Sequence, residues 1–115
     1  MVRRRLRKPP LEEPERLWIK QLYEKCGCTV INFSQAQRAQ QTAGIPDLLV
    51  YDRRSGTYWW HEVKRQQGPE FYALAHGQTD DQTWFQGLVE EFGQEYLLGA
   101  RDVAIAKLQA LGRLL

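Results

Sequence analysis

Long apolar runs and cysteine clusters are what this sequence most clearly lacks. No stretch approaches the roughly 20 consecutive apolar residues that cross a bilayer, and no charged-then-apolar leader opens the chain. Only two cysteines occur, Cys26 and Cys28 in "CGC", and a disulfide between residues so close would be strained. Since no further cysteine or histidine cluster completes a zinc site, we expect reduced thiols beside a turn. These absences favour a cytoplasmic protein, whether encoded by a cell or by a phage or prophage.

The basic residues are distributed unevenly. Of the sixteen Lys and Arg residues, five lie in "RRRLRK" near the start of the chain, namely Arg3, Arg4, Arg5, Arg7 and Lys8. The remainder holds eleven basic against fourteen acidic residues, so the net charge of +2 hides a mildly acidic body. We therefore expect a flexible basic arm at residues 1–10 and a single domain at residues 11–115. Such an arm is either a solvated terminus or a segment that neutralises phosphates.

The periodicity of apolar residues predicts three helices and four strands in one domain. We expect helices at 12–27, 79–93 and 101–115, and strands at 28–34, 47–52, 57–65 and 95–100. Thr79 and Gln82 fit a capping box at the second helix. The last helix should turn five residues inward, Ala104, Ile105, Leu108, Leu111 and Leu115. The order α-β-β-β-α-β-α predicts an α/β fold, a mixed β-sheet flanked by helices.

The strand "TYWWHEVKR" carries two opposite charges in its most apolar part. Side chains alternate along a strand, so Glu62 and Lys64 share a face with Tyr58 and Trp60, whereas His61 lies on the other. A four-residue loop, Arg53 to Gly56, pairs Asp52 with Thr57 and places Asp47 opposite Glu62. A three-residue loop would instead place Asp47 opposite Val63.

Two carboxylates so close together repel each other and need a positive charge between them. Lys64 supplies part of it, and a divalent metal bound by oxygen ligands, Mg²⁺ or Mn²⁺, would supply the rest. The backbone carbonyl of Val63 could be a further ligand, and Glu15, on the inward face of the first helix, could join, with Glu12 as its rival. The ordinary alternative is that Asp47 is a turn residue and that Glu62 and Lys64 form an edge ion pair.

"GIPD" at 44–47 followed by "HEVK" at 61–64 resembles the PD-(D/E)xK nuclease superfamily. An early helical Glu and a Gln that opens the next helix narrow the resemblance to the VRR-NUC group. The resemblance implies the restriction-endonuclease-like fold, with Asp47 and Glu62 as metal ligands and Lys64 acting on the attacking water. It also implies that Glu15 corresponds to the acidic residue on the family's first helix, and Gln82 to the glutamine that contacts the metal site or the phosphate. The long segment before Gln82 leaves Gln66, Gln67 and Gln78 as alternatives for that glutamine.

The function that the resemblance implies is a Mg²⁺- or Mn²⁺-dependent deoxyribonuclease, with DNA as substrate and a branched or junction DNA as one form of it. It also implies a homodimer, with no membrane and no small-molecule cofactor. Arg38 and Arg65 flank the two motifs and, with the arm, are candidates for phosphate contacts. The alternative is a non-catalytic nucleic-acid-binding module that keeps the nuclease fold; a structural protein with ordinary ion pairs is a third possibility.

Overall fold

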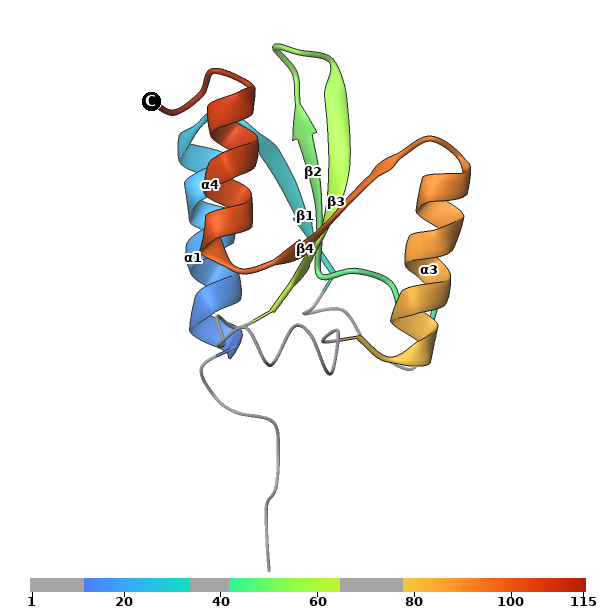
Figure 1. Cartoon of the computed structure of the whole chain (residues 1–115). Helices are drawn as coiled ribbons and strands as arrows, with labels where there is room; N and C mark the ends of the chain where they lie inside the picture. Colours follow the sequence, from blue (N-terminus) through green and yellow to red (C-terminus); the bar gives the residue numbers. More distant parts are fainter. Residues whose placement is uncertain (1–11, 34–41, 65–77) are drawn as a thin grey trace, which may run out of the picture.

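A single mixed sheet organises the computed structural model, which describes residues 12–33, 42–64 and 78–115 (Figure 1). The strands are β1 (Thr29–Asn32), β2 (Leu48–Asp52), β3 (Thr57–Val63) and β4 (Glu95–Gly99), and their spatial order is the same as their chain order. β1, β2 and β3 pair antiparallel, and β4 pairs parallel to β3. The parallel pair requires a crossover, and helix α3 lies within it.

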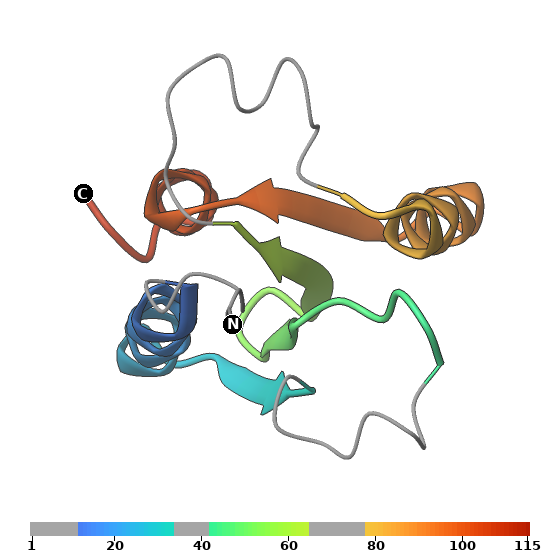
Figure 2. The same ribbon diagram turned by 90° about the horizontal axis from the view of Figure 1, so that it is seen from below.

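The helices cover the two faces of the sheet unequally. Helices α1 (Glu12–Lys25) and α4 (Arg101–Ala110) lie together on one face, and α3 (Asp80–Glu91) lies on the other. The view from below shows α3 beside the β4 edge, with no helix of the described residues beside β1 and β2 on that face (Figure 2). Over the described residues, the predicted α-β-β-β-α-β-α order is confirmed.

The core lies between the sheet and the α1–α4 pair. Trp59, His61 and Val63 point toward these helices and are fully buried, because alternation along β3 places all three on one face. Ile19 and Tyr23 of α1 complete this core with Leu108 of α4. The alternate β3 side chains, Tyr58, Trp60 and Glu62, therefore lie on the opposite face, the one on which α3 packs, as the alternation predicted.

Buried His61 is fixed by a directed chain of hydrogen bonds. Trp59 Nε1 donates to Tyr23 Oη at 3.3 Å, and Tyr23 Oη lies 2.7 Å from His61 Nδ1. His61 Nε2 lies 3.0 Å from the Gly99 carbonyl, which can only accept, so the neutral ring carries its proton on Nε2 and accepts at Nδ1 from Tyr23. His61 is thus a packed residue of the core rather than part of a surface site.

The β2–β3 hairpin has the predicted four-residue loop. Asp52 pairs with Thr57, and the Asp52 carboxylate accepts hydrogen bonds from Ser55 Oγ at 2.7 Å and from Arg113 Nη2 at 2.8 Å. Burial alone would raise the pKa of Asp52, but these two donors hold it below its usual value. Arg113 therefore ties the end of the chain to the base of the hairpin loop.

The prediction for the last helix was wrong at its C-terminal end. α4 ends at Ala110, Gly112 adopts a positive φ of 76°, and Leu115 is fully exposed rather than inward. Glycine ends helices because it adopts this left-handed conformation without strain. Ala104 and Leu108 are buried, as predicted.

The apolar side chains of α3 do not all face inward. Val89 is buried and Phe85 is partly buried, whereas Trp84, Leu88 and Phe92 are exposed. Because α3 packs on the sheet near β3 and β4 and no described helix lies beside it on that face, its inward stripe fills the contact and the other apolar stripe remains on the surface.

Two of the predicted absences can be checked over the described residues. Cys26 and Cys28 are both free thiols. No helix among residues 12–33, 42–64 and 78–115 is long and apolar enough to cross a membrane.

We expect His61 to make the fold sensitive to acid. Burial lowers its pKa from 6.5 to about 4, so the folded protein binds this proton less readily than the unfolded chain. The associated stabilisation is complete above pH 6.5 and is lost as the pH falls to about 4. We expect the free energy of unfolding, measured with urea at each pH, to fall more steeply with falling pH in the wild type than in His61→Gln. Between pH 6.5 and 4 the difference should reach about 3 kcal/mol in total. If the unfolding free energies of the two proteins changed equally with pH, His61 would not be the source of the acid sensitivity.

Candidate metal and phosphate site

Asp47 and Glu62 lie side by side on the α3 face of the sheet. The register of β2 and β3 pairs Leu48 with His61, so its next position places Asp47 opposite Glu62. The Asp47 carboxylate reaches across the hairpin, and its Oδ2 accepts a hydrogen bond from the Val63 backbone N–H at 3.0 Å. Asp47 is thus held by a fixed backbone donor beside Glu62.

Glu62 is buried and held by two positive or polar donors. Its Oε2 accepts from Gln82 Nε2 at 2.9 Å and lies 3.5 Å from the Lys64 ammonium. Lys64 also donates to Gln82 Oε1 at 3.4 Å. The three side chains form a triangle in which Lys64 partly neutralises a carboxylate that is only 3% exposed.

The capping box of α3 aims Gln82 at this triangle. Thr79 Oγ1 accepts from the Gln82 backbone N–H at 3.2 Å, and Gln82 Oε1 accepts from the Thr79 N–H at 3.0 Å. With its oxygen engaged by the cap, Gln82 presents its NH₂ group to Glu62. One side chain therefore both starts the helix and links that helix to the acidic pair.

Gly44 brings the first turn of α3 to the loop that carries Asp47. Gly44 has a φ of 86°, and a Cβ there would collide with the Asp81 carbonyl and lie 2.9 Å from the Gln82 nitrogen. Only glycine permits both this backbone conformation and this close approach. The "GIPD" motif thus determines where Gln82 lies as well as where Asp47 lies.

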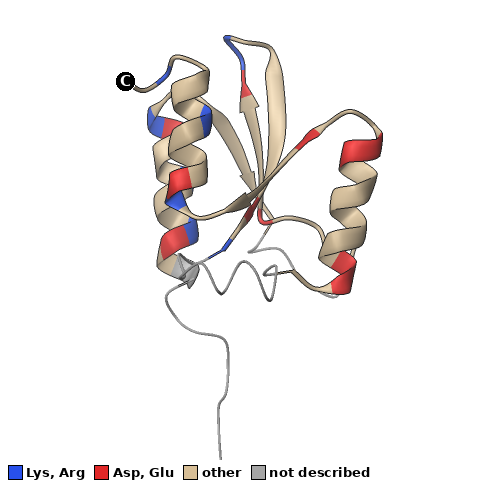
Figure 3. Ribbon diagram, in the orientation of Figure 1, with Lys and Arg blue, Asp and Glu red and all other residues tan. Residues whose placement is uncertain are grey.

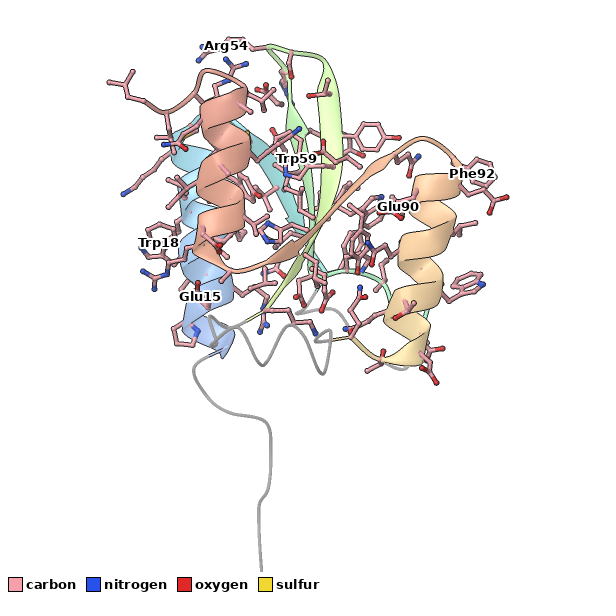
Figure 4. The ribbon with its side chains drawn as sticks, viewed as in Figure 1. Glu15, Trp18, Arg54, Trp59, Glu90 and Phe92 are labelled. Atoms are coloured by element: carbon pink, nitrogen blue, oxygen red, sulfur yellow. The ribbon has the colours of Figure 1, made fainter. Side chains whose placement is uncertain are left out.

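Glu15 of α1 binds the first residue of α4. Its carboxylate accepts from Arg101 Nε at 3.0 Å and from the Arg101 backbone N–H at 3.2 Å. The N-cap residue of α4 is Ala100, whose side chain cannot accept a hydrogen bond. Glu15 of α1 therefore caps the helix instead. Glu15 and Trp18 are labelled at the lower end of α1 in Figure 4, and the Arg101 guanidinium lies 4.3 Å from the Trp18 ring centroid.

Tyr96 is a neighbour of the site that the sequence analysis missed. Tyr96 lies on β4 and pairs with Trp60 of β3, and its hydroxyl accepts a hydrogen bond from Gln78 Nε2 at 3.1 Å. Burial raises the pKa of Tyr96, and the charges of Glu62 and Asp47 raise it further, so its hydroxyl stays protonated in their field. The parallel register of β3 and β4, which the sequence pattern did not indicate, places it there.

The donor set suits a hard cation that keeps several of its waters. Among the described residues, no group of three or more His, Cys, Asp and Glu side chains converges on one point. Mg²⁺ needs no such cage, since one or two carboxylates with waters and a phosphate satisfy it. Asp47 and Glu62, with the Val63 carbonyl nearby, therefore fit Mg²⁺ or Mn²⁺ better than a metal that needs a full protein shell.

Several predicted site residues lie outside the described residues. They are the arm residues Arg3, Arg4, Arg5, Arg7 and Lys8, together with Arg38, Arg65, Gln66 and Gln67. Of the four glutamines considered for the site, the structure describes Gln78 and Gln82. Gln78 bonds to Tyr96 and Gln86, and Gln82 bonds to Glu62.

The comparisons with known proteins support the fold. No protein-family model matches the sequence, and no curated protein matches it. A solved structure described as "VRR_NUC domain" superimposes with a TM-score of 0.59 at 21% identity, over 86% of this chain and 94% of that chain. This chain therefore has the fold of a VRR_NUC domain, and the resemblance noted in its motifs is confirmed at the level of the fold.

We expect Gly44→Ala to displace α3 and to be more damaging than a matched glycine change. Gly93, at the other end of α3, also has a positive φ, 74°, but a Cβ there meets nothing within 4 Å. Gly93→Ala should therefore cost only the backbone strain, about 1 kcal/mol, whereas Gly44→Ala adds the collision and should cost about 3 kcal/mol or more. Urea unfolding measures both, and equal losses would show that the close approach is unimportant.

Proposed function

We propose that this protein is a metal-dependent endonuclease that hydrolyses DNA phosphodiester bonds. The observation that supports it best is the cluster of Asp47, Glu62, Lys64 and Gln82 on a nuclease fold. Two carboxylates, an ammonium and an oriented amide meet at one end of a hairpin, where α3 begins. A pair of like charges in an otherwise apolar strand pairing is costly unless it holds a cation.

Asp47 and Glu62 would hold Mg²⁺ or Mn²⁺, with the Val63 carbonyl as a further ligand. A metal held there would lower the pKa of a bound water and would polarise a phosphate oxygen. The backbone N–H of Val63 keeps the Asp47 carboxylate in place, and Gln82 does the same for Glu62. Both ligands are therefore oriented before substrate arrives, which reduces the reorganisation that binding would need.

Lys64 contributes a positive charge to the site in addition to that of a bound metal. Its ammonium lies 3.5 Å from Glu62 Oε2 and 3.4 Å from Gln82 Oε1, and its side chain is mostly buried. From there it is placed to accompany the attacking water and to offset the negative charge that develops on the phosphate. Gln82, bonded to both residues, keeps the ammonium and the carboxylate at a fixed separation.

Glu15 remains a candidate fourth member of the site, as the family resemblance implies. Its present partner is Arg101, so a catalytic role would require sharing its carboxylate between α4 and the metal. The basic arm, Arg38 and Arg65 are proposed to contact phosphates of the DNA. Those contacts would give affinity that falls with salt and carries no sequence preference.

The main alternative is a module that binds nucleic acid without cutting it. The geometry disfavours this alternative, because a buried carboxylate beside Asp47 repels phosphate when no metal is present. A structural protein, the third possibility, would not need the Gln82 amide to be directed at Glu62.

The proposal predicts cleavage that depends on metal and on Asp47. Supercoiled plasmid and a four-way junction are incubated with the protein and Mg²⁺, Mn²⁺ or a chelator, and we expect cutting only with metal. Asp47→Asn should abolish cutting yet bind DNA at least as well as the wild type in chelator, because a negative charge has been removed. Binding without cutting under every condition would instead favour the module, and neither binding nor cutting would favour the structural protein.

Lys64→Ala in the same assay separates a chemical role from a binding role. We expect turnover to fall by about a hundred- to a thousandfold while DNA affinity changes little, since the ammonium acts where charge develops. Lys20→Ala is the matched control, because Lys20 pairs with Glu24 on the surface of α1, on the opposite face of the sheet. Wild-type turnover in Lys64→Ala would refute this role.

We also propose that the protein forms a homodimer through the outer side of α3. Trp84 and Leu88 lie one helical turn apart, and Phe92 follows at the C-cap. All three are exposed, with Trp84 at 60% and Phe92 at 71%, and exposed apolar patches of this kind often mark interfaces.

Light scattering should therefore give a dimeric mass for the wild type and a monomeric mass for Trp84→Glu. Leu17→Glu serves as control, because Leu17 is a similarly exposed apolar residue on α1. A monomeric wild type would contradict the dimer and leave the nuclease proposal intact.

A further inference from the structure

A hollow lies on the same sheet face as the acidic pair, at the opposite end of the β2–β3 hairpin. It has a volume of about 460 Å³ and is lined by side chains of β1, β2 and β3, including Ile31, Tyr51 and Tyr58, with Arg53 at its rim. All three apolar residues are exposed to between 38% and 42%. It lies over the part of the sheet that no described helix covers (Figure 2).

The two tyrosines form a fixed aromatic surface. Their ring centroids are 5.6 Å apart with an interplanar angle of 33°, so they contact each other rather than opening a slot between them. Gln94 Nε2 donates to Tyr58 Oη at 2.7 Å, which restrains the ring of Tyr58 from the β4 side. A planar group can therefore stack on the outer faces of these rings at little cost in side-chain ordering.

The charges near this surface favour an anion. Arg53 and Arg54 occupy the exposed hairpin loop, where Figure 3 shows the basic colour at the tip, and Arg54 is labelled there in Figure 4. The acid among the lining residues, Asp52, is 2% exposed and is paired with Arg113 on the other face. A ligand with a flat apolar part and a negative backbone matches an aromatic floor with an arginine rim.

The position of the groove relative to the acidic pair is fixed by β3 itself. Tyr58 and Glu62 lie on the same face, four residues apart, which corresponds to about 13 Å along the strand. That distance is about four stacked steps of one DNA strand, and fewer steps of an extended strand. A single nucleic-acid strand can thus reach both places at once.

We propose that Tyr51 and Tyr58 form a stacking site for an unpaired nucleobase, with Arg53 contacting the adjoining phosphate. The ligand class is single-stranded DNA or a single-stranded segment of a branched DNA, because a base inside a duplex presents no free face. The site rests on the proposed nuclease function in one respect: the bound strand continues toward Asp47 and Glu62. The stacking surface thereby selects substrates that carry an unpaired nucleotide near the scissile bond.

A binding measurement without cleavage tests this site directly. The full-length protein in chelator is titrated into a short single-stranded oligonucleotide that contains a fluorescent adenine analogue, and into the corresponding duplex. Stacking should quench the analogue in the single strand and not in the duplex. Tyr51→Leu should weaken single-strand binding by about five- to a hundredfold, the range that loss of one base–aromatic contact gives, whereas Tyr51→Phe should bind like the wild type.

The outcomes separate this inference from the nuclease proposal. If Tyr51→Leu binds the single strand like the wild type, or if the loss is equal for duplex and single strand, the stacking site is refuted even when cleavage persists. If the wild type binds and quenches the single strand but never cuts DNA with metal, the stacking site stands and the nuclease proposal fails. A change in the mass of Tyr51→Leu by light scattering, with unchanged oligonucleotide binding, would show that the groove seats a second copy of the chain instead.

Discussion

The close packing of Gly44 against the first turn of α3 is the constraint on which the site depends. The loop before β2 and the N-terminus of α3 approach so closely that no side chain fits between them. This contact sets the position of Gln82, and Gln82 in turn sets the positions of Glu62 and Lys64. The same loop continues directly into Asp47. A backbone contact without side-chain chemistry of its own therefore controls the geometry of four charged or polar groups.

The central polar residues of β3 have different partners on the two faces of the sheet. In the core beneath α1 and α4, Tyr23, Trp59 and His61 form a neutral hydrogen-bond chain that ends at the Gly99 carbonyl, and the ion pairs of that face, Asp52 with Arg113 and Glu15 with Arg101, lie at its margins. On the α3 face, charges of both signs meet around Glu62, where a cation and a phosphate would add further bonds. Neutral networks stabilise a core at low cost, whereas uncompensated charge is costly when buried. The first face has the character of a scaffold, and the second has the character of a site.

Much of the fold and part of the site could be predicted, because the relevant signals are local. The hairpin register followed from one loop length, and alternation along β3 then assigned Glu62 and His61 to opposite faces. The capping box likewise identified the start of α3, whereas the contact of Gln82 with Glu62 emerged only from the structure. What could not be predicted depends on contacts across the fold. Tyr96 reaches the site only through the parallel pairing of β3 and β4, and Glu15 turned out to contact Arg101 at a helix start that has no capping side chain of its own.

The end of the last helix shows a different limit. The apolar spacing of the final residues continues the helical pattern past Ala110, so periodicity alone placed Leu115 inward. The structure ends the helix before Gly112, where the backbone turns left-handed, and Arg113 then reaches Asp52. The left-handed turn at Gly112 ends the helix despite the apolar pattern, and the bond of Arg113 to Asp52 is made after that turn.

The sequence separations of these contacts imply an order of assembly. On the site face, Asp47 contacts Val63 across 16 residues and Glu62 contacts Gln82 across 20. On the other face, Asp52 contacts Arg113 across 61 residues, and Glu15 contacts Arg101 across 86. Closing a short loop costs less entropy than closing a long one. The central hairpin can therefore form while the chain ends are still unfolded, and the two terminal helices, joined through Glu15, close the structure last.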